Sequence, residues 1–196
     1  MAIYLPFKKL TQWQQIACCA ALLERMLPNY QMFAQAAQFG DFQVLRNQLD
    51  IIWQRLDKSQ KVKINYDAQL AKLEVQIPDP EAFQFFGVYP ALDAAMALMS
   101  LLQTMQDNEQ EGFASISRLS ENSVHFYIEL MLAEQAADDE LITEESIKQH
   151  PLMQWEIATQ NEVFDFLQAS PETKKTCQMV KQMVLEQGLS NLGIEI

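Results

Sequence analysis

The residues best suited to acid–base or metal chemistry lie in one predicted helix. Glu121, His125 and Glu129 follow one another at intervals of four, which places them on a single helix face. Such a face suits a single metal ion or a proton relay. Ordinary surface ion pairs explain the same spacing, and we favour that interpretation. A di-iron bundle is disfavoured, because neither His125 nor His150, the two histidines of the chain, has a glutamate three residues before it.

Charged and phenolic side chains in otherwise apolar segments form a second candidate site. Glu24 and Arg25 lie near the end of an apolar helical stripe with Tyr30 close behind, and Tyr89 and Asp93 lie in another apolar run. If folding brought all five to one pocket, their carboxylates would have shifted pKa values and could serve a small molecule. We therefore take Glu24, Arg25, Tyr30, Tyr89 and Asp93 as candidate ligand-binding residues. The sequence identifies no catalytic residue, no metal ligands and no cofactor.

A structural role is the favoured alternative for Asp93. A carboxylate in the first turns of a helix is stabilised by the positive end of the helix dipole, and Arg25 or Arg46 could pair with it. Truncation of Asp93 to alanine would then cost about 3 kcal/mol, because a buried cation would lose its partner.

The motifs of common enzyme classes are absent. The sequence has no Gly-x-Gly-x-x-Gly, Gly-x-x-x-x-Gly-Lys or Gly-x-Ser-x-Gly pattern, so the usual phosphate-binding loops and nucleophile turns are missing. The three cysteines are an odd number, and Cys18 and Cys19 lie in a run of small residues without a basic neighbour. We therefore expect Cys18, Cys19 and Cys177 to be buried thiols rather than disulfides or nucleophiles.

The chain is acidic, with a formal net charge of −12, and its charge is unevenly distributed. Residues 1–80 carry 9 basic and 7 acidic side chains, whereas residues 81–196 carry 5 and 19. The acidic half repels phosphate backbones and anionic lipid headgroups. We therefore expect neither nucleic acid nor a membrane as a partner.

The elements that position these residues are expected to be helices. An apolar run at 87–102, which Pro90 can open, predicts a central helix at roughly 90–106 that is buried on every face. Thr11, Asp41 and Ser170 are predicted N-caps, and Pro28 is predicted to end the first helix. Apolar residues at intervals of three and four predict further helices over 29–37, 42–56, 65–77, 113–130, 152–166 and 171–188. Alternating β-branched runs are almost absent, so the fold class should be all-α.

Length and composition predict one packed domain. With 196 residues, of which 49% are hydrophobic, the chain is expected to form a compact bundle of about seven helices over residues 1–196. The run at 87–102 is shorter than the roughly 20 residues of a membrane span. Residues 1–7 lack the apolar core of a signal peptide, so we expect a cytoplasmic protein.

Several segments carry a family resemblance. They are Glu24–Tyr30 with Phe33, Phe39–Asp41, Trp53, Gly87–Ala94 and Ser190–Ile194, and together they span nearly the whole chain. In these segments the chain resembles the YjaG-like family of bacterial proteins of unknown function. The resemblance implies an all-helical, cytoplasmic, single-domain protein, and it brings no activity and no site residues with it.

Two functions from different classes remain open. The first, which we favour, is a non-enzymatic protein that binds another protein or a second copy of itself, because catalytic motifs are missing and the charge is split between the two halves. The second is a small-molecule-binding protein or an enzyme that uses the polar residues at the start of the central helix. A pocket at which those side chains converge would favour the second function.

Overall fold

The computed structural model describes residues 3–108, 112–135 and 141–196. These residues form eight α-helices, close to the seven expected, and two 3-10 turns; they contain no strand, so the all-α prediction is confirmed. The helices are α1 (Gln12–Ala37), α2 (Phe42–Leu56), α3 (Tyr66–Glu74), α4 (Val88–Asp107), α5 (Gly112–Gln135), α6 (Glu144–Gln149), α7 (Pro151–Ala169) and α8 (Lys174–Leu185). The 3-10 turns are η1 (Phe7–Lys9) and η2 (Pro80–Ala82). None of these helices is both long and apolar enough to cross a bilayer.

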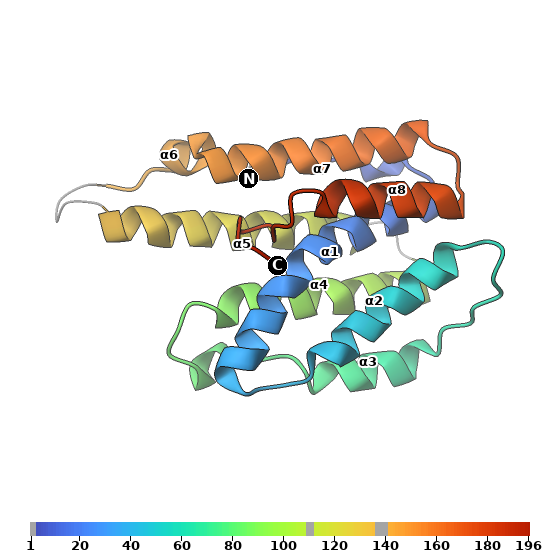
Figure 1. Cartoon of the computed structure of the whole chain (residues 1–196), viewed down its shortest axis with the longest axis horizontal. Helices are drawn as coiled ribbons and strands as arrows, with labels where there is room; N and C mark the ends of the chain where they lie inside the picture. The colour runs from blue at the N-terminus through green and yellow to red at the C-terminus, as the bar shows by residue number, and fades with distance from the viewer. Residues whose placement is uncertain (1–2, 109–111, 136–140) are drawn as a thin grey trace.

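The helix α1 lies at the centre of the bundle. It packs against α4 and α2 and also against α5, α7 and α8. Figure 1 shows α1 passing diagonally between α5, α7 and α8 along one side and α2 and α3 along the other. Most of the other helices therefore pack around α1 and α4 together, and not around the predicted central helix α4 alone.

The predicted end of the first helix at Pro28 is wrong. Proline removes one backbone hydrogen bond but tolerates helical backbone angles, and α1 continues through it to Ala37. The turns beyond it bury Tyr30 and Phe33 against the core, so packing compensates for the lost bond. The separate helix expected over 29–37 is the second half of α1.

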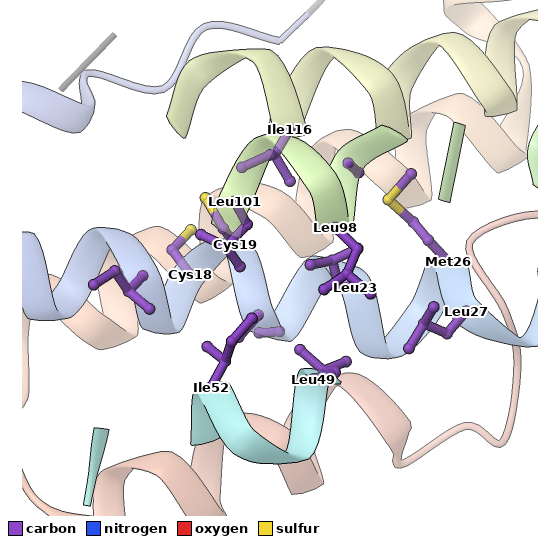
Figure 2. Packing of buried hydrophobic residues seen from close by; sticks show 14 of the residues in the cluster. Cys18, Cys19, Leu23, Met26, Leu27, Leu49, Ile52, Leu98, Leu101 and Ile116 are labelled. Carbon is purple, nitrogen blue, oxygen red and sulfur yellow. The ribbon is translucent and has the colours of Figure 1, made fainter. Parts of the chain in front are cut away.

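The prediction for α4 is correct in position and wrong in burial. The helix begins two residues before the expected start and ends one residue after the expected end. Tyr89 and Met96 are respectively 50% and 37% exposed, so one stripe of α4 faces solvent. The opposite side meets α1, where Leu98 lies near Leu23 and Leu101 near Cys19 (Figure 2).

The helix caps explain most of the boundaries. Thr11 forms a capping box with Gln14, and Asp41 accepts a hydrogen bond from the first turn of α2, as predicted. The predicted N-cap at Ser170 is wrong, because Ser170 is the C-cap of α7. The N-cap of α8 is Thr173, so α8 begins three residues later than a cap at Ser170 would place it. Both threonine and serine suit this role, so local preference alone did not distinguish the two positions.

Candidate functional site

The five candidate residues lie on two packed helices but have different surroundings. Glu24, Arg25 and Tyr30 are on α1, and Tyr89 and Asp93 are on α4. Each has its own set of partners, described below, and none hydrogen-bonds to another of the five. The single pocket that the small-molecule interpretation required is therefore not formed by these side chains.

Arg25 forms an ion pair in the interior of the bundle. Its Nη1 lies 2.5 Å from Oε2 of Glu156 on α7, and both side chains are completely buried. The guanidinium also lies over the ring of Trp155, 4.2 Å from the ring centroid. A charge in such surroundings is tolerated because it has an ionic partner and an aromatic face.

The carboxylate of Glu156 organises a buried polar network. Its Oε1 accepts hydrogen bonds from Ser120 Oγ on α5, at 2.6 Å, and from Gln160 Nε2, at 2.7 Å. Gln160 in turn accepts a hydrogen bond from Ser117 Oγ. The Ser120 hydroxyl accepts from Asn191 Nδ2 in the C-terminal segment, at 3.2 Å. The network thus joins α1, α5, α7 and the C-terminal segment through one anionic centre.

Sequence reasoning did not identify Glu156 as a partner, although a signal was present. The buried side of α7 includes Met153, Glu156, Gln160 and Val163, which recur at intervals of three and four. The sequence predicted another stripe for this helix, which shares only Val163 with the buried side, because the two polar residues interrupt an otherwise apolar series. The predicted stripe was Leu152, Trp155, Thr159, Val163 and Phe166. Polar side chains at core spacing are the signal that could have identified the network.

Glu24 lies in a separate cluster between α1, α2 and α8. Its carboxylate binds Arg46 through two hydrogen bonds, of 2.6 and 2.9 Å, and accepts another from Trp53 Nε1, at 2.8 Å. Lys181 Nζ lies 3.0 Å away. Burial alone would raise the pKa of Glu24, but the hydrogen bonds from Arg46 together with the two cationic neighbours hold it below the usual value. Glu24 is therefore ionised and ties three helices together.

Tyr30 has a structural environment. Its ring is fully buried, and its hydroxyl donates a hydrogen bond of 2.8 Å to the carbonyl oxygen of Gln76. Burial, with a contribution from Asp41, raises the pKa of Tyr30 to about 12. A phenol with this pKa stays protonated at neutral pH and acts as a donor to the loop after α3.

Asp93 has no arginine partner among its hydrogen bonds and ion pairs. Its Oδ2 accepts a hydrogen bond of 2.7 Å from Ser123 Oγ on α5, whereas Arg25 pairs with Glu156 and Arg46 with Glu24 and Asp50. The predicted pairing with Arg25 or Arg46 is therefore wrong. Burial raises the pKa of Asp93 to about 6, and the Ser123 hydrogen bond opposes this only in part.

This shift predicts that Asp93 opposes folding above about pH 6. The folded protein keeps the proton of Asp93 to a higher pH than the unfolded chain does, so between pH 4 and 6 the folded state binds more protons and stability falls as pH rises. We expect Asp93→Asn to raise the free energy of unfolding at pH 8 by about 1 to 3 kcal/mol and to change it little at pH 4. Urea denaturation of the wild type and of Asp93→Asn at pH 4 and pH 8 measures the change in the free energy of unfolding. The exposed Asp165→Asn on α7 is the control, and a destabilised Asp93→Asn at pH 8 would contradict the assignment.

An aromatic groove lies between the start of α4 and the C-terminal half of α5. It has a volume of about 480 Å³ and is lined by Phe86, Tyr89, Phe126, Glu129, Leu130 and Ala133. Tyr89 and Phe126 are respectively 50% and 53% exposed, and the Phe86 ring packs on Tyr89 with a centroid distance of 6.1 Å. Tyr89 is the one candidate residue that lines it. Sequence reasoning missed Phe126 because an exposed aromatic residue at helical spacing looks like a core residue. It missed Phe86 because this half-buried residue lies in the turn before α4, where no helical pattern marks it.

The histidine face predicted on α5 divides between two surfaces. Glu121 and His125 line a cavity of about 460 Å³ together with Glu144 and Glu145 of α6, whereas Glu129 lines the aromatic groove. His125 Nε2 lies 3.9 Å from a carboxylate oxygen of Glu144. Across the described parts of the chain, no three His, Cys, Asp or Glu side chains are grouped so as to hold a metal ion.

The cysteines are buried thiols, as predicted. All three are free, and Cys18 and Cys19 lie side by side in the core of α1 (Figure 2). Burial raises the pKa of Cys18 to about 12 and that of Cys177 to about 11. Thiols with these pKa values are protonated at neutral pH and are poor nucleophiles.

Comparisons with known proteins agree on one family. The chain matches the family described as "Protein of unknown function (DUF416)" over residues 2–195. It is 36% identical over 196 residues to "Uncharacterized protein YjaG" of Escherichia coli strain K12, covering 98% of this chain and 95% of that protein. An uncharacterised protein of Haemophilus influenzae is 31% identical over 198 residues, which cover 98% of this chain and 96% of that one.

A solved structure has the same fold. The crystal structure of a DUF416 family protein from Shewanella baltica superimposes with a TM-score of 0.86, at 35% sequence identity, and the match covers 99% of this chain and 100% of that one. The sequence match and the structural match both extend over nearly all of the chain, and the resemblance expected from the sequence is confirmed. The chain therefore belongs to the DUF416 family.

Proposed function

We propose that this protein is a non-enzymatic interaction module that binds a basic, amphipathic helix of another protein in the aromatic groove between α4 and α5. The observation that carries the proposal is the exposure of Tyr89 and Phe126 on a concave apolar surface. Exposed aromatic side chains gathered in one hollow are typical of protein-binding surfaces, where aromatic residues supply most of the binding energy. We also infer a cytoplasmic protein, because Cys18, Cys19 and Cys177 are free thiols.

The shape of the groove favours a helical partner. Its walls come from two packed helices, α4 and α5, and from Phe86 just before α4. A third helix can lie in such a groove and insert apolar side chains spaced by three and four residues. The groove volume of about 480 Å³ accommodates a few large anchors rather than a whole domain surface.

The charge around the groove favours a basic partner from another protein. Glu129 is the one charged residue in the lining, and residues 81–196 carry 19 acidic and 5 basic side chains. A partner with lysine or arginine beside its apolar anchors would be attracted to this surface. A second copy of the chain carries the same net charge of −12 and would be repelled.

Site-specific photocrosslinking in cells tests both the site and the occupant. A photoreactive phenylalanine analogue replaces Ala133, which lines the groove, and Ala158, an exposed alanine on α7, serves as the matched control position. We expect position 133, and not 158, to crosslink to a peptide of another protein that is basic and has apolar residues at helical spacing. Sequencing of the crosslinked peptide by mass spectrometry gives the readout.

The Phe126→Ala substitution then measures the contribution of the groove. Loss of an aromatic side chain that the bound partner buries is expected to weaken binding at least about 30-fold, because anchors of this kind are worth about 2 kcal/mol or more. Binding of the identified peptide, measured by fluorescence anisotropy, should also weaken as salt is raised. Crosslinks between two copies of this chain, crosslinks only at position 158, or unchanged affinity in Phe126→Ala would each contradict the proposal.

A further inference from the structure

The aromatic groove between α4 and α5 adjoins a second hollow. This hollow, which we call the α1 cavity, has a volume of about 190 Å³ and lies between α1, the turn before α4, α5 and the C-terminal segment. Its lining residues are Asn29, Met32, Phe33, Ala36, Phe85, Phe86, Gly87, Pro90, Tyr127, Leu192 and Ile194. None of them is charged. Phe86 lines both the α1 cavity and the aromatic groove, so the two hollows share a wall.

The ring of Phe86 separates the two hollows. It packs against Tyr89, with a centroid distance of 6.1 Å, and against Tyr127, with a centroid distance of 5.7 Å. Tyr89 lines the groove, whereas Tyr127 lines the α1 cavity. Phe86 therefore has one hollow on each side, and its own ring is half-buried rather than enclosed.

Both hollows are accessible from outside the bundle. In the lining of the α1 cavity, Ala36 and Phe85 are exposed, the latter by 41%. Figure 1 shows the C-terminal half of α5 extending beyond the start of α4. The groove follows this extension from Phe126 to Ala133, which is seven residues or about 10 Å along the helix. A bound segment can therefore reach from the groove across Phe86 to the cavity.

The two hollows differ in what they can hold. An apolar cavity of about 150 Å³ is large enough for benzene, so the α1 cavity accommodates one aromatic or branched aliphatic side chain. Its lining favours an apolar occupant, because a buried lysine or arginine would lose its hydration without gaining an anionic partner. The groove is larger, at about 480 Å³, and has Glu129 in its lining. Basic residues of a partner are therefore attracted to the groove and not to the α1 cavity.

We propose that the groove and the α1 cavity are two pockets of one site, and that the partner helix inserts one large apolar side chain on each side of the Phe86 ring. This inference rests on the proposed binding of a basic amphipathic helix in the groove, and it adds the spacing of the two anchors. Side chains that contact opposite sides of one ring lie at least about 7 Å apart, because each carbon contact is about 3.5 to 4.0 Å. Helix positions three or four residues apart are separated by only about 5 to 6 Å. The matching position is therefore seven residues away, at about 10.5 Å.

Photocrosslinking at Ala36 tests whether the α1 cavity belongs to the binding site. The photoreactive phenylalanine analogue replaces Ala36, in parallel with the groove position Ala133 and the control position Ala158. We expect positions 36 and 133 to capture the same peptide of the same protein, at attachment sites about two helical turns apart. Capture at position 133 alone, or of a different molecule at position 36, keeps helix binding in the groove and overturns the second pocket. Absence of capture at position 133 contradicts both.

Affinity measurements separate the α1 cavity from the groove. Ala36→Leu narrows the mouth of the cavity and is expected to weaken binding of the captured peptide at least about 10-fold, as measured by fluorescence anisotropy. Ala158→Leu makes the same change on α7 and should leave the affinity unchanged. Both alanines are exposed in helices, and leucine is also a good helix former, so both variants keep the fold. Unchanged affinity in Ala36→Leu, with weaker binding in Phe126→Ala, would overturn the second pocket alone.

A double-mutant cycle tests the spacing of the anchors. The groove anchor is the peptide residue whose replacement by alanine has little further effect once Phe126 is alanine, because the two changes remove the same contact. We expect alanine at the position seven residues from this anchor to weaken binding to the wild type at least about 10-fold and to have little further effect on Ala36→Leu. Coupling to Ala36→Leu at a position three or four residues from the groove anchor, or at no position, would overturn the two-pocket arrangement.

Discussion

Arg25→Ala is expected to lower the free energy of unfolding by about 3 to 5 kcal/mol, because it leaves the Glu156 carboxylate buried without its cation. Both side chains are completely buried, and the Nη1–Oε2 distance is 2.5 Å. The substitution also removes the contact of the guanidinium with the Trp155 ring. The hydrogen bond from the Asn191 amide to the carbonyl oxygen of Arg25 uses main-chain atoms and remains available. Urea denaturation followed by circular dichroism measures the loss.

Two further variants separate the charge from the packing. Arg118→Ala removes an exposed arginine from α5 and should change stability by less than about 0.5 kcal/mol. In the double variant Arg25→Met, Glu156→Gln both charges are absent and an amide oxygen can still accept from Ser120 and Gln160, so most of the lost stability should return. Two results would show that the ion pair does not stabilise the fold as assigned. One is an Arg25→Ala variant as stable as the wild type, and the other is a double variant less stable than Arg25→Ala.

Leu23→Ala is expected to cost about 3 to 5 kcal/mol through the cavity it leaves at the centre of the bundle. Leu23 is completely buried on α1. Figure 2 shows it between Leu98 of α4 on one side and Leu49 of α2 on the other. Three helices with other contacts of their own meet there, so they can close only part of the space that the side chain leaves. Thermal and urea denaturation give the size of the effect.

A matched leucine at an exposed position tests whether burial causes the stability loss expected for Leu23→Ala. Leu141 is 88% exposed, and Leu141→Ala should change stability by less than about 0.5 kcal/mol. Leu23→Met, which keeps most of the volume, should cost less than about 1.5 kcal/mol. If Leu23→Ala and Leu141→Ala had the same effect, the central position of α1 would not be supported.

Most of the secondary structure followed from local sequence. The spacing of apolar residues and the caps at Thr11 and Asp41 predicted α1 and α2 correctly at their N-termini, and the run around Pro90 predicted α4 within two residues. These signals act over three or four residues, within one turn of a helix, so they can be read without knowing what the helix packs against. The buried thiols at Cys18 and Cys19 followed in the same way from a run of small residues.

The partners of the charged side chains were decided by tertiary structure. Arg25 and Glu156 are 131 positions apart, and no local pattern relates them. Asp93 could have paired with either of two arginines by composition, but both are held by other carboxylates, so a serine on α5 is its hydrogen-bond partner. The continuation of α1 through Pro28 has the same origin, because burial of the following turns outweighs one lost hydrogen bond.

The sequence by itself therefore determined an all-helical chain, its family and the positions of most helices. Tertiary structure decided which buried polar groups meet, that Tyr89 faces solvent beside Phe126, and that Phe86 lines both the groove and the α1 cavity. The physical reason is the range of the interactions. Helix formation depends on neighbours along the chain, whereas a groove or a cavity depends on how whole helices pack, and each packing arrangement sums many weak contacts between distant residues.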